Sequence, residues 1–260
     1  MSGTRIEGES MPETAPKARV AAAWAVHAFT ASGVVTALLA IAALIAGDLR
    51  LALLWLGAAL IIDGVDGPMA RKVEVSRYAP RFDGAVLDLV IDYLTYTVIP
   101  ALLVYRFGLV PAGWEIPAAA YIMLTSLYCF GNREMKTGDL YFSGFPAVWN
   151  VVVLYFYVLG TGSWMNLAAI AALGILTFVP FKYVHPFRVR MWRPLTLAIT
   201  GLWALSTFWL VLTSGPGTAP SEAAPLAFWA FLAASLYFLG LCAWRTLAGP
   251  RGEETAGEKA

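Results

Sequence analysis

The sequence has little charge of either sign and few residues that bind soft metals. Only 13% of its 260 residues are charged, against 59% that are hydrophobic, and the formal net charge is +1. Such a chain has no basic field to attract nucleic acid, so we expect no nucleic-acid partner. It holds two histidines and two cysteines. Cys129 and Cys242 lie in apolar runs, which favours packing positions over a disulfide or a zinc site.

Long apolar runs dominate what is there. At about 1.5 Å per residue, a helix of about 20 residues crosses a hydrocarbon core of about 30 Å. The runs predict an all-α, polytopic membrane protein with about eight transmembrane helices, at 22–46, 50–70, 84–105, 113–131, 145–161, 164–181, 195–213 and 224–247. Residues 1–18 and 249–260 are expected to be tails around a catalytic domain at 19–248. The acidic first tail is unlike a secretory signal peptide.

Lys and Arg are distributed unevenly among the loops between these runs. The loops after the second, fourth and sixth runs carry ten of them, whereas those after the first, third, fifth and seventh carry two, Arg50 and Arg106. Cytoplasmic loops of membrane proteins are enriched in Lys and Arg. We therefore predict that both tails and the even-numbered loops are cytoplasmic.

Four aspartates interrupt the apolar pattern near the second and third runs. Asp63 and Asp66 fall within about 100° of each other on a helix, and Asp88 and Asp92 are one helical turn apart, so two helices can direct four carboxylates at one point. A charged side chain in an apolar helix is costly and indicates a functional site. Neighbouring carboxylates repel unless they are protonated or neutralised by hard divalent cations. We expect a pair of Mg²⁺ or Mn²⁺ ions.

Small and basic residues accompany the acids. Gly67 and Ala70 would let a ligand approach the helix backbone, and Arg71 can bind phosphate through two hydrogen bonds. Acids, metal ions, small residues and arginine together indicate a diphosphate site, where metal ions contact the oxygens of a transferring phosphoryl group.

This pattern resembles the signature of the CDP-alcohol phosphotransferases, which are integral membrane enzymes. Their motif reads D-x2-D-G-x2-A-R, a spacer, then G-x3-D-x3-D. The chain matches every fixed position: Asp63, Asp66, Gly67, Ala70, Arg71, Gly84, Asp88 and Asp92. Its spacer, Lys72 to Asp83, has twelve residues and is longer than usual, which implies a longer turn between the two helices.

The surrounding segments resemble one branch of that family, the bacterial phosphatidylcholine synthases. The similar segments include YFSGFPAVWN at 141–150 and VPFKYVHPFRVRMWRPL at 179–195, and the resemblance extends over about 25–245. It implies transfer of the phosphatidyl group of CDP-diacylglycerol to choline, which yields phosphatidylcholine and CMP. It also implies a homodimer in the bacterial inner membrane, with the active site facing the cytoplasm.

Residue roles follow from the same resemblance. Asp63, Asp66 and Asp88 would bind the metal ions, and Asp92 would deprotonate choline while also touching a metal ion. The CDP pocket would be lined by Asp63, Asp66, Gly67, Ala70, Arg71 and Gly84. A quaternary ammonium is held over aromatic faces, and the candidates are Tyr93, Tyr96, Tyr141, Trp149 and Tyr183. Candidates for the lipid phosphate are Arg133, Lys182 and Arg188, whose charge the loop asymmetry explains equally well.

Two alternatives stay open from the sequence. Another CDP-diacylglycerol transferase, such as a phosphatidylserine synthase, would share the motif and differ in its acceptor. A secondary transporter also uses acids within the membrane. A transporter, however, does not require Gly67, Ala70, Arg71 and Gly84 at fixed offsets from those acids.

Overall fold

The computed structural model describes residues 16–132, 142–183, 192–213 and 220–248. Helices make up most of this part of the chain. Four helical segments within it are long and apolar enough to cross a membrane: Lys17–Ala46, Gly84–Arg106, Arg193–Thr213 and Pro225–Ala248. The chain is therefore a helical membrane protein, as the apolar runs predicted.

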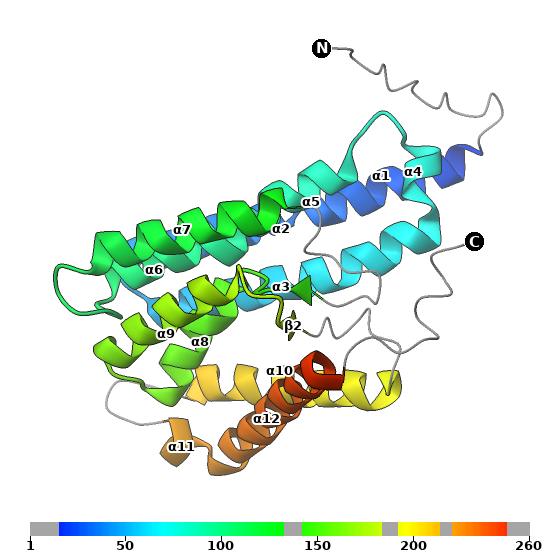
Figure 1. Ribbon diagram of the computed structural model, residues 1–260. Coiled ribbons are helices and arrows are strands. Elements are labelled where there is room, and N and C mark those ends of the chain that lie inside the picture. The colour runs from blue at the N-terminus through cyan, green and yellow to red at the C-terminus, as the bar shows by residue number, and fades with distance from the viewer. Residues whose placement is uncertain (1–15, 133–141, 184–191, 214–219, 249–260) are drawn as a thin grey trace.

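One helix, α3, runs through the middle of the molecule (Figure 1). On one side of it lie α1, α2, α5, α6 and α7, and on the other α8 to α12. The helices are α1 (Lys17–Ala31), α2 (Gly33–Ala46), α3 (Leu49–Val73), α4 (Val75–Tyr78), α5 (Gly84–Asp92), the π-helix η1 (Tyr93–Val98), α6 (Ile99–Arg106), α7 (Glu115–Gly131), α8 (Trp149–Leu159), α9 (Ser163–Leu176), α10 (Arg193–Thr213), α11 (Pro220–Ala223) and α12 (Pro225–Ala248).

A two-stranded sheet, which an all-α prediction did not include, joins two distant segments. Strands β1 (Phe142–Ser143) and β2 (Lys182–Tyr183) pair antiparallel, with Phe142 opposite Tyr183. The pairing continues beyond the strands, because the amide of Gly144 donates to the carbonyl of Phe181 at 2.9 Å.

Each predicted span contains helix, but the fifth and sixth were predicted too long. α8 has 11 residues and α9 has 14, so they extend about 16 Å and about 21 Å, less than the hydrocarbon thickness of about 30 Å. Before α8, Gly144 and Ala147 adopt positive φ angles. After α9, Pro180 disfavours helix in the residue before it. Apolar composition alone does not reveal these breaks.

The first span contains a break that the apolar run does not indicate. α1 ends at Ala31 and α2 begins at Gly33, and the hydroxyl of Ser32 donates to the carbonyl of Phe29 at 2.6 Å. A serine that bonds back into its own helix competes with the regular backbone pattern and bends the helix. α2 then ends at Gly47, which has the positive φ typical of a helix C-terminus.

Most of the core lies between α2, α3, α6, α7, α8 and α9. Its buried members include Leu53, Leu103, Ile122, Val153 and Ile170. A second cluster joins α8 to α10 and α12. Many other large apolar side chains, such as those of Leu38, Ile45, Leu205 and Leu226, are exposed on the outside, as expected where lipid replaces water. These clusters hold α3 firmly, so the acids that it carries sit on a rigid element.

Candidate active site

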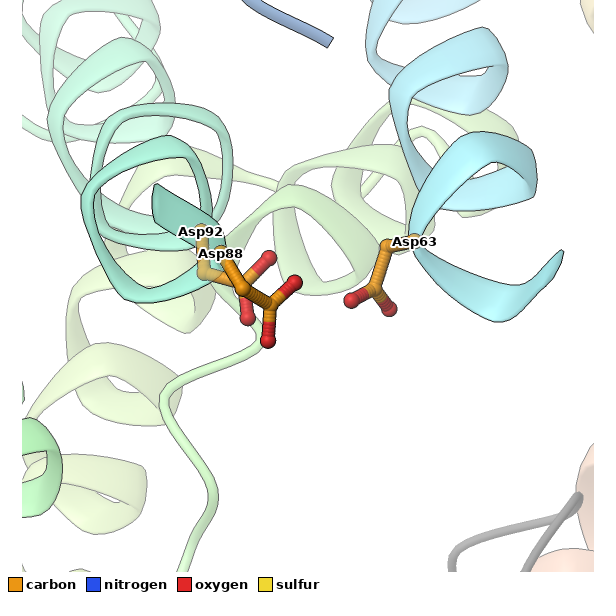
Figure 2. A group of neighbouring side chains, drawn as sticks. All are labelled: Asp63, Asp88 and Asp92. Atoms are coloured by element: carbon orange, nitrogen blue, oxygen red, sulfur yellow. The ribbon is translucent and has the colours of Figure 1, made fainter. Parts of the chain in front are cut away.

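Three carboxylates converge between α3 and α5. In Figure 2, Asp88 and Asp92 project side by side from α5 toward Asp63 on α3. One oxygen from each carboxylate lies within 4.8 Å of an oxygen from each of the others, and all three side chains are partly buried. The prediction that two helices direct their acids at one point is confirmed for these three.

The sequence of α5 explains why its acids face inward. Asp88 and Asp92 are one turn apart, so they share a face, while Val86, Leu89 and Val90 lie on the opposite side and are exposed. Asp83 caps the N-terminus of α5, because its side chain accepts hydrogen bonds from the amides of Ala85 and Val86 in the first turn. In a membrane, the exposed apolar side of α5 faces lipid and its acidic side faces α3.

The fourth acid, Asp66, lies outside the group of three. Its side chain is 6% exposed, so it is more buried than the three grouped acids. It is still close enough to Asp92 for the two carboxylates to interact electrostatically. The structure therefore brings three of the four predicted acids into one group, and the predicted role of Asp66 stays a prediction.

The π-helix η1 begins directly after Asp92 and supplies a partner for Asp63. The Tyr96 hydroxyl donates to Oδ2 of Asp63 at 2.6 Å, and its side chain is buried. π-helical turns often occur at functional sites, where the extra residue re-aims a side chain. Tyr96 thus orients an acid through its hydroxyl, and its predicted contact with choline stays a prediction. No residue spacing indicated this role, because it depends on the π-helical turn.

The small residues of the motif have side chains packed beside them. A Cβ atom at Gly67 would lie 3.4 Å from Nη1 of Arg71, so the guanidinium covers that glycine. A Cβ atom at Gly84 would lie 2.7 Å from Cε1 and 3.2 Å from Nδ1 of His27. His27, remote from the motif in sequence, therefore packs directly against Gly84, and the role of Gly84 in lining the CDP pocket stays a prediction.

His27 is enclosed by aromatic rings. Its centroid lies 5.7 Å from that of Trp24 and 4.7 Å from that of Phe82. The side chain is buried, and its Nε2 has no hydrogen-bond partner among the residues that the structure describes. Nothing in the residues around His27 indicated this packing, because Phe82 and Gly84 lie about 55 residues away in the chain.

The chain has curated relatives of known activity, although no protein-family model matches it. It is 50% identical to "Phosphatidylcholine synthase" from Pseudomonas aeruginosa over 226 residues, which cover 87% of this chain and 92% of the relative. This chain belongs to the phosphatidylcholine synthase family. Proteins of the same name from Mesorhizobium japonicum (42% over 199 residues, 76% of this chain and 73% of the relative) and Legionella pneumophila (36% over 198 residues, 74% and 78%) also match. The resemblance inferred from the signature is confirmed.

In this phosphatidylcholine synthase family member, the three grouped acids offer donors suited to a hard divalent cation. Each provides carboxylate oxygens, which Mg²⁺ and Mn²⁺ prefer over nitrogen or sulfur. Asp66, outside the group, has a carboxylate of the same kind, with about four lone-pair positions. The residues present therefore fit a bound metal ion.

The described residues predicted to bind choline differ in their surroundings. Trp149 is fully buried in the core, and its indole N–H donates to the hydroxyl of Ser126 at 2.9 Å; its choline contact stays a prediction. Tyr93 follows Asp92 and stacks edge-on against Phe130. Tyr141 lies outside the described residues.

Two of the remaining predicted contacts, Lys182 and Tyr183, form β2. Tyr183 packs against Phe145 and Phe181, and burial raises the pKa of its hydroxyl to about 12. The backbone amide of Lys182 donates to the hydroxyl of Thr246 on α12 at 2.9 Å. These contacts hold β2 against α12. Arg133 and Arg188 lie outside the described residues, so the lipid-phosphate prediction stays a prediction.

Proposed function

We propose that this protein transfers the phosphatidyl group of CDP-diacylglycerol to choline and releases CMP. The observation that carries the proposal is the convergence of Asp63, Asp88 and Asp92 in a chain up to 50% identical to phosphatidylcholine synthases. The relatives' names favour choline over serine as the acceptor.

Asp92 is the proposed general base. The oxygen of choline forms a bond to the phosphorus of the phosphatidyl group, the bond from that phosphorus to the CMP oxygen breaks, and the choline proton passes to Asp92. General-base help of this kind contributes about 10² to 10⁴ in rate. Asp92 suits the role because it lies at the end of α5, where the partly buried acids meet.

The other acids would hold one or two Mg²⁺ or Mn²⁺ ions. Asp63, Asp66 and Asp88 are the proposed ligands, with Asp92 as a further contact. When bound, such ions would neutralise charge on the diphosphate and its leaving group. Tyr96 keeps the Asp63 carboxylate in place through its hydrogen bond. Gly67, Ala70, Arg71 and Gly84 are proposed to form the CDP side of the site, where the exposed Arg71 can reach phosphate.

We further propose eight membrane-embedded helices, with both tails and the acid site on the cytoplasmic side of a bacterial inner membrane. The excess of Lys and Arg in the loops after the second, fourth and sixth helical spans supports this orientation. α8 and α9 are too short to cross alone, so within the bundle they would span only part of the bilayer. A homodimer is proposed on the family resemblance alone.

A reconstituted assay tests the proposed reaction. The full-length protein in proteoliposomes containing CDP-diacylglycerol receives labelled choline, serine or glycerol 3-phosphate, with Mn²⁺ or with EDTA. We expect phosphatidylcholine and CMP in equal amounts from choline, only with the metal. Phosphatidylserine formed instead would refute choline while leaving the reaction class standing. Phosphatidylcholine formed at full rate in EDTA would refute the metal role.

A further inference from the structure

The long spacer of the motif folds onto the N-terminal helix and forms a surface that the proposed reaction does not use. α4, which the spacer forms, lies beside the first turns of α1 at one end of the molecule (Figure 1), and the two helices pack together. Val75 and Tyr78 of α4 are buried with Ala23 and Val26 of α1. This packing gives the charged side chains around it fixed neighbours.

Two arginines from distant parts of the chain contact one tyrosine ring. The Cζ atom of Arg19 lies 6.0 Å from the centroid of the Tyr78 ring, and that of Arg77 lies 5.4 Å from it. Both distances fit cation–π contacts, which extend to about 6 Å. The ring therefore holds two like charges near each other, an arrangement that a bound anion would stabilise.

Positive charge exceeds negative charge where α4 meets α1. The exposed basic side chains are those of Lys17, Arg19, Arg77 and Arg81. Within the described part of the chain, the ion pair recorded for them is that of Arg77 with Glu74 at 3.5 Å. Both partners are exposed, so this pair contributes little. The next acid, Asp83, caps α5.

Exposed aromatic rings adjoin these charges. Trp24 of α1 is 49% exposed and Phe82, which follows Arg81, is 39% exposed. Their ring centroids lie 5.6 Å apart. Tryptophan is enriched where helices leave a membrane, and Lys17–Ala46 is long and apolar enough to cross one. The charges at the start of this segment would therefore lie at the level of the lipid headgroups.

We propose that this basic aromatic surface binds anionic phospholipid headgroups in the leaflet on the side of the acid site. Its members are Lys17, Arg19, Trp24, Arg77, Arg81 and Phe82. The attraction of Lys and Arg to cytoplasmic loops explains the charges but does not require their shared contact with Tyr78. Exposed aromatic rings at the end of a membrane-crossing segment favour a bilayer over a soluble acidic partner. The proposal is independent of the proposed transfer reaction.

The test uses the full-length protein in nonionic detergent with EDTA, without CDP-diacylglycerol or choline. The readout is the rise in melting temperature as phosphatidylglycerol, which is anionic, or phosphatidylethanolamine, which is zwitterionic, is added to the micelles. The first variant is Arg19→Gln. Its matched control is Arg106→Gln, because Arg106 is an exposed arginine at 5.9 Å from the Phe107 ring. Arg106 ends α6, which lies toward the opposite end of the molecule from α4 (Figure 1).

Phosphatidylglycerol should stabilise the parent, phosphatidylethanolamine should not, and 1 M NaCl should abolish the effect, because it screens charges beyond about 3 Å. Each basic side chain near an anionic surface strengthens binding about fivefold. Arg19→Gln should therefore need about fivefold more phosphatidylglycerol for half-maximal stabilisation, and Arg19→Gln combined with Arg77→Gln about 10-fold or more. The charge-retaining pair Arg19→Lys and Arg77→Lys should stay within about threefold of the parent. Arg106→Gln should match the parent.

The lipid-free melting temperature checks folding. If the double glutamine variant does not fold, Lys17→Gln combined with Arg81→Gln carries the same expectation, since neither residue has a recorded contact with Tyr78.

Equal stabilisation by the two lipids would overturn the proposal. So would an unchanged phosphatidylglycerol titration in the double glutamine variant, or an effect that persists in 1 M NaCl. An equal loss in Arg106→Gln would show that only the total charge of the protein matters. A double lysine variant as weak as the double glutamine variant would show that charge is not the cause.

Discussion

Replacement of Gly84 by alanine separates two explanations for a glycine in the motif. The new Cβ atom would lie 2.7 Å from Cε1 and 3.2 Å from Nδ1 of His27, where ordinary contacts begin at 3.4 Å. The ring cannot easily yield, because it is buried between Trp24 and Phe82. Overpacking of this kind costs about 1 to 3 kcal/mol. We expect Gly84→Ala to lower the melting temperature and to slow turnover by displacing α5.

A double-mutant cycle shows where that cost arises. If His27 is the obstacle, Gly84→Ala combined with His27→Ala should be more stable than the sum of the single changes predicts, by about 1 to 3 kcal/mol. Gly57→Ala is the control, because Gly57 lies within α3 with nothing within 4 Å of an added Cβ atom. It should be neutral or stabilising, since alanine favours a helix by about 1 kcal/mol over glycine.

Two results would refute this reasoning. The first is a Gly84→Ala variant with the parent's melting temperature, which would mean that the ring moves at no cost. The second is a double variant no better than Gly84→Ala alone. If Gly84→Ala or the double variant raised KM for CDP-diacylglycerol without a change in melting temperature, we would conclude that Gly84 is needed for the close approach of the nucleotide.

Three further substitutions test the roles assigned to single side chains. Asp92→Asn should lower kcat by about 10² to 10⁴ and leave binding of CDP-diacylglycerol intact; a parent rate in proteoliposomes would exclude the general-base role. Tyr96→Phe removes the donor to Asp63 and should lower kcat about 10-fold or more at an unchanged melting temperature, which steady-state kinetics would check. Trp149→Phe leaves Ser126 without its indole partner, so it should lower the melting temperature while KM for choline stays constant; a raised KM alone would restore Trp149 as a choline contact.

The acid group was predictable because its information is local. Spacings of three and four residues place Asp63, Asp88 and Asp92 on the inner faces of their helices whatever else the chain does. Two such faces on neighbouring helices then have to meet, because neither is stable against lipid. The helical periodicity and the energetic cost of burying charge were therefore sufficient to predict that these three acids meet.

The partners of those acids were not predictable, because they depend on packing between distant segments. His27 reaches Gly84 only because α1 docks on α5, and nothing in the residues near His27 specifies that docking. Tyr96 reaches Asp63 only because the helix widens after Asp92 into a π-helical turn. The short α8 similarly depends on backbone angles at Gly144 and Ala147, not on the apolar run.

The twelve-residue spacer of the motif bears on both the local pattern and the packing between distant segments. It was expected to form a longer turn, yet α3 continues to Val73 and α4 occupies Val75 to Tyr78. Val75 and Tyr78 are buried together with Ala23 and Val26 of α1. The residues of the longer spacer therefore give α1 an apolar surface to pack against beside the motif, about one turn from His27. A shorter spacer would leave less surface for α1, and the position of Gly84 against His27 would then depend on the lipid-exposed helix pair alone.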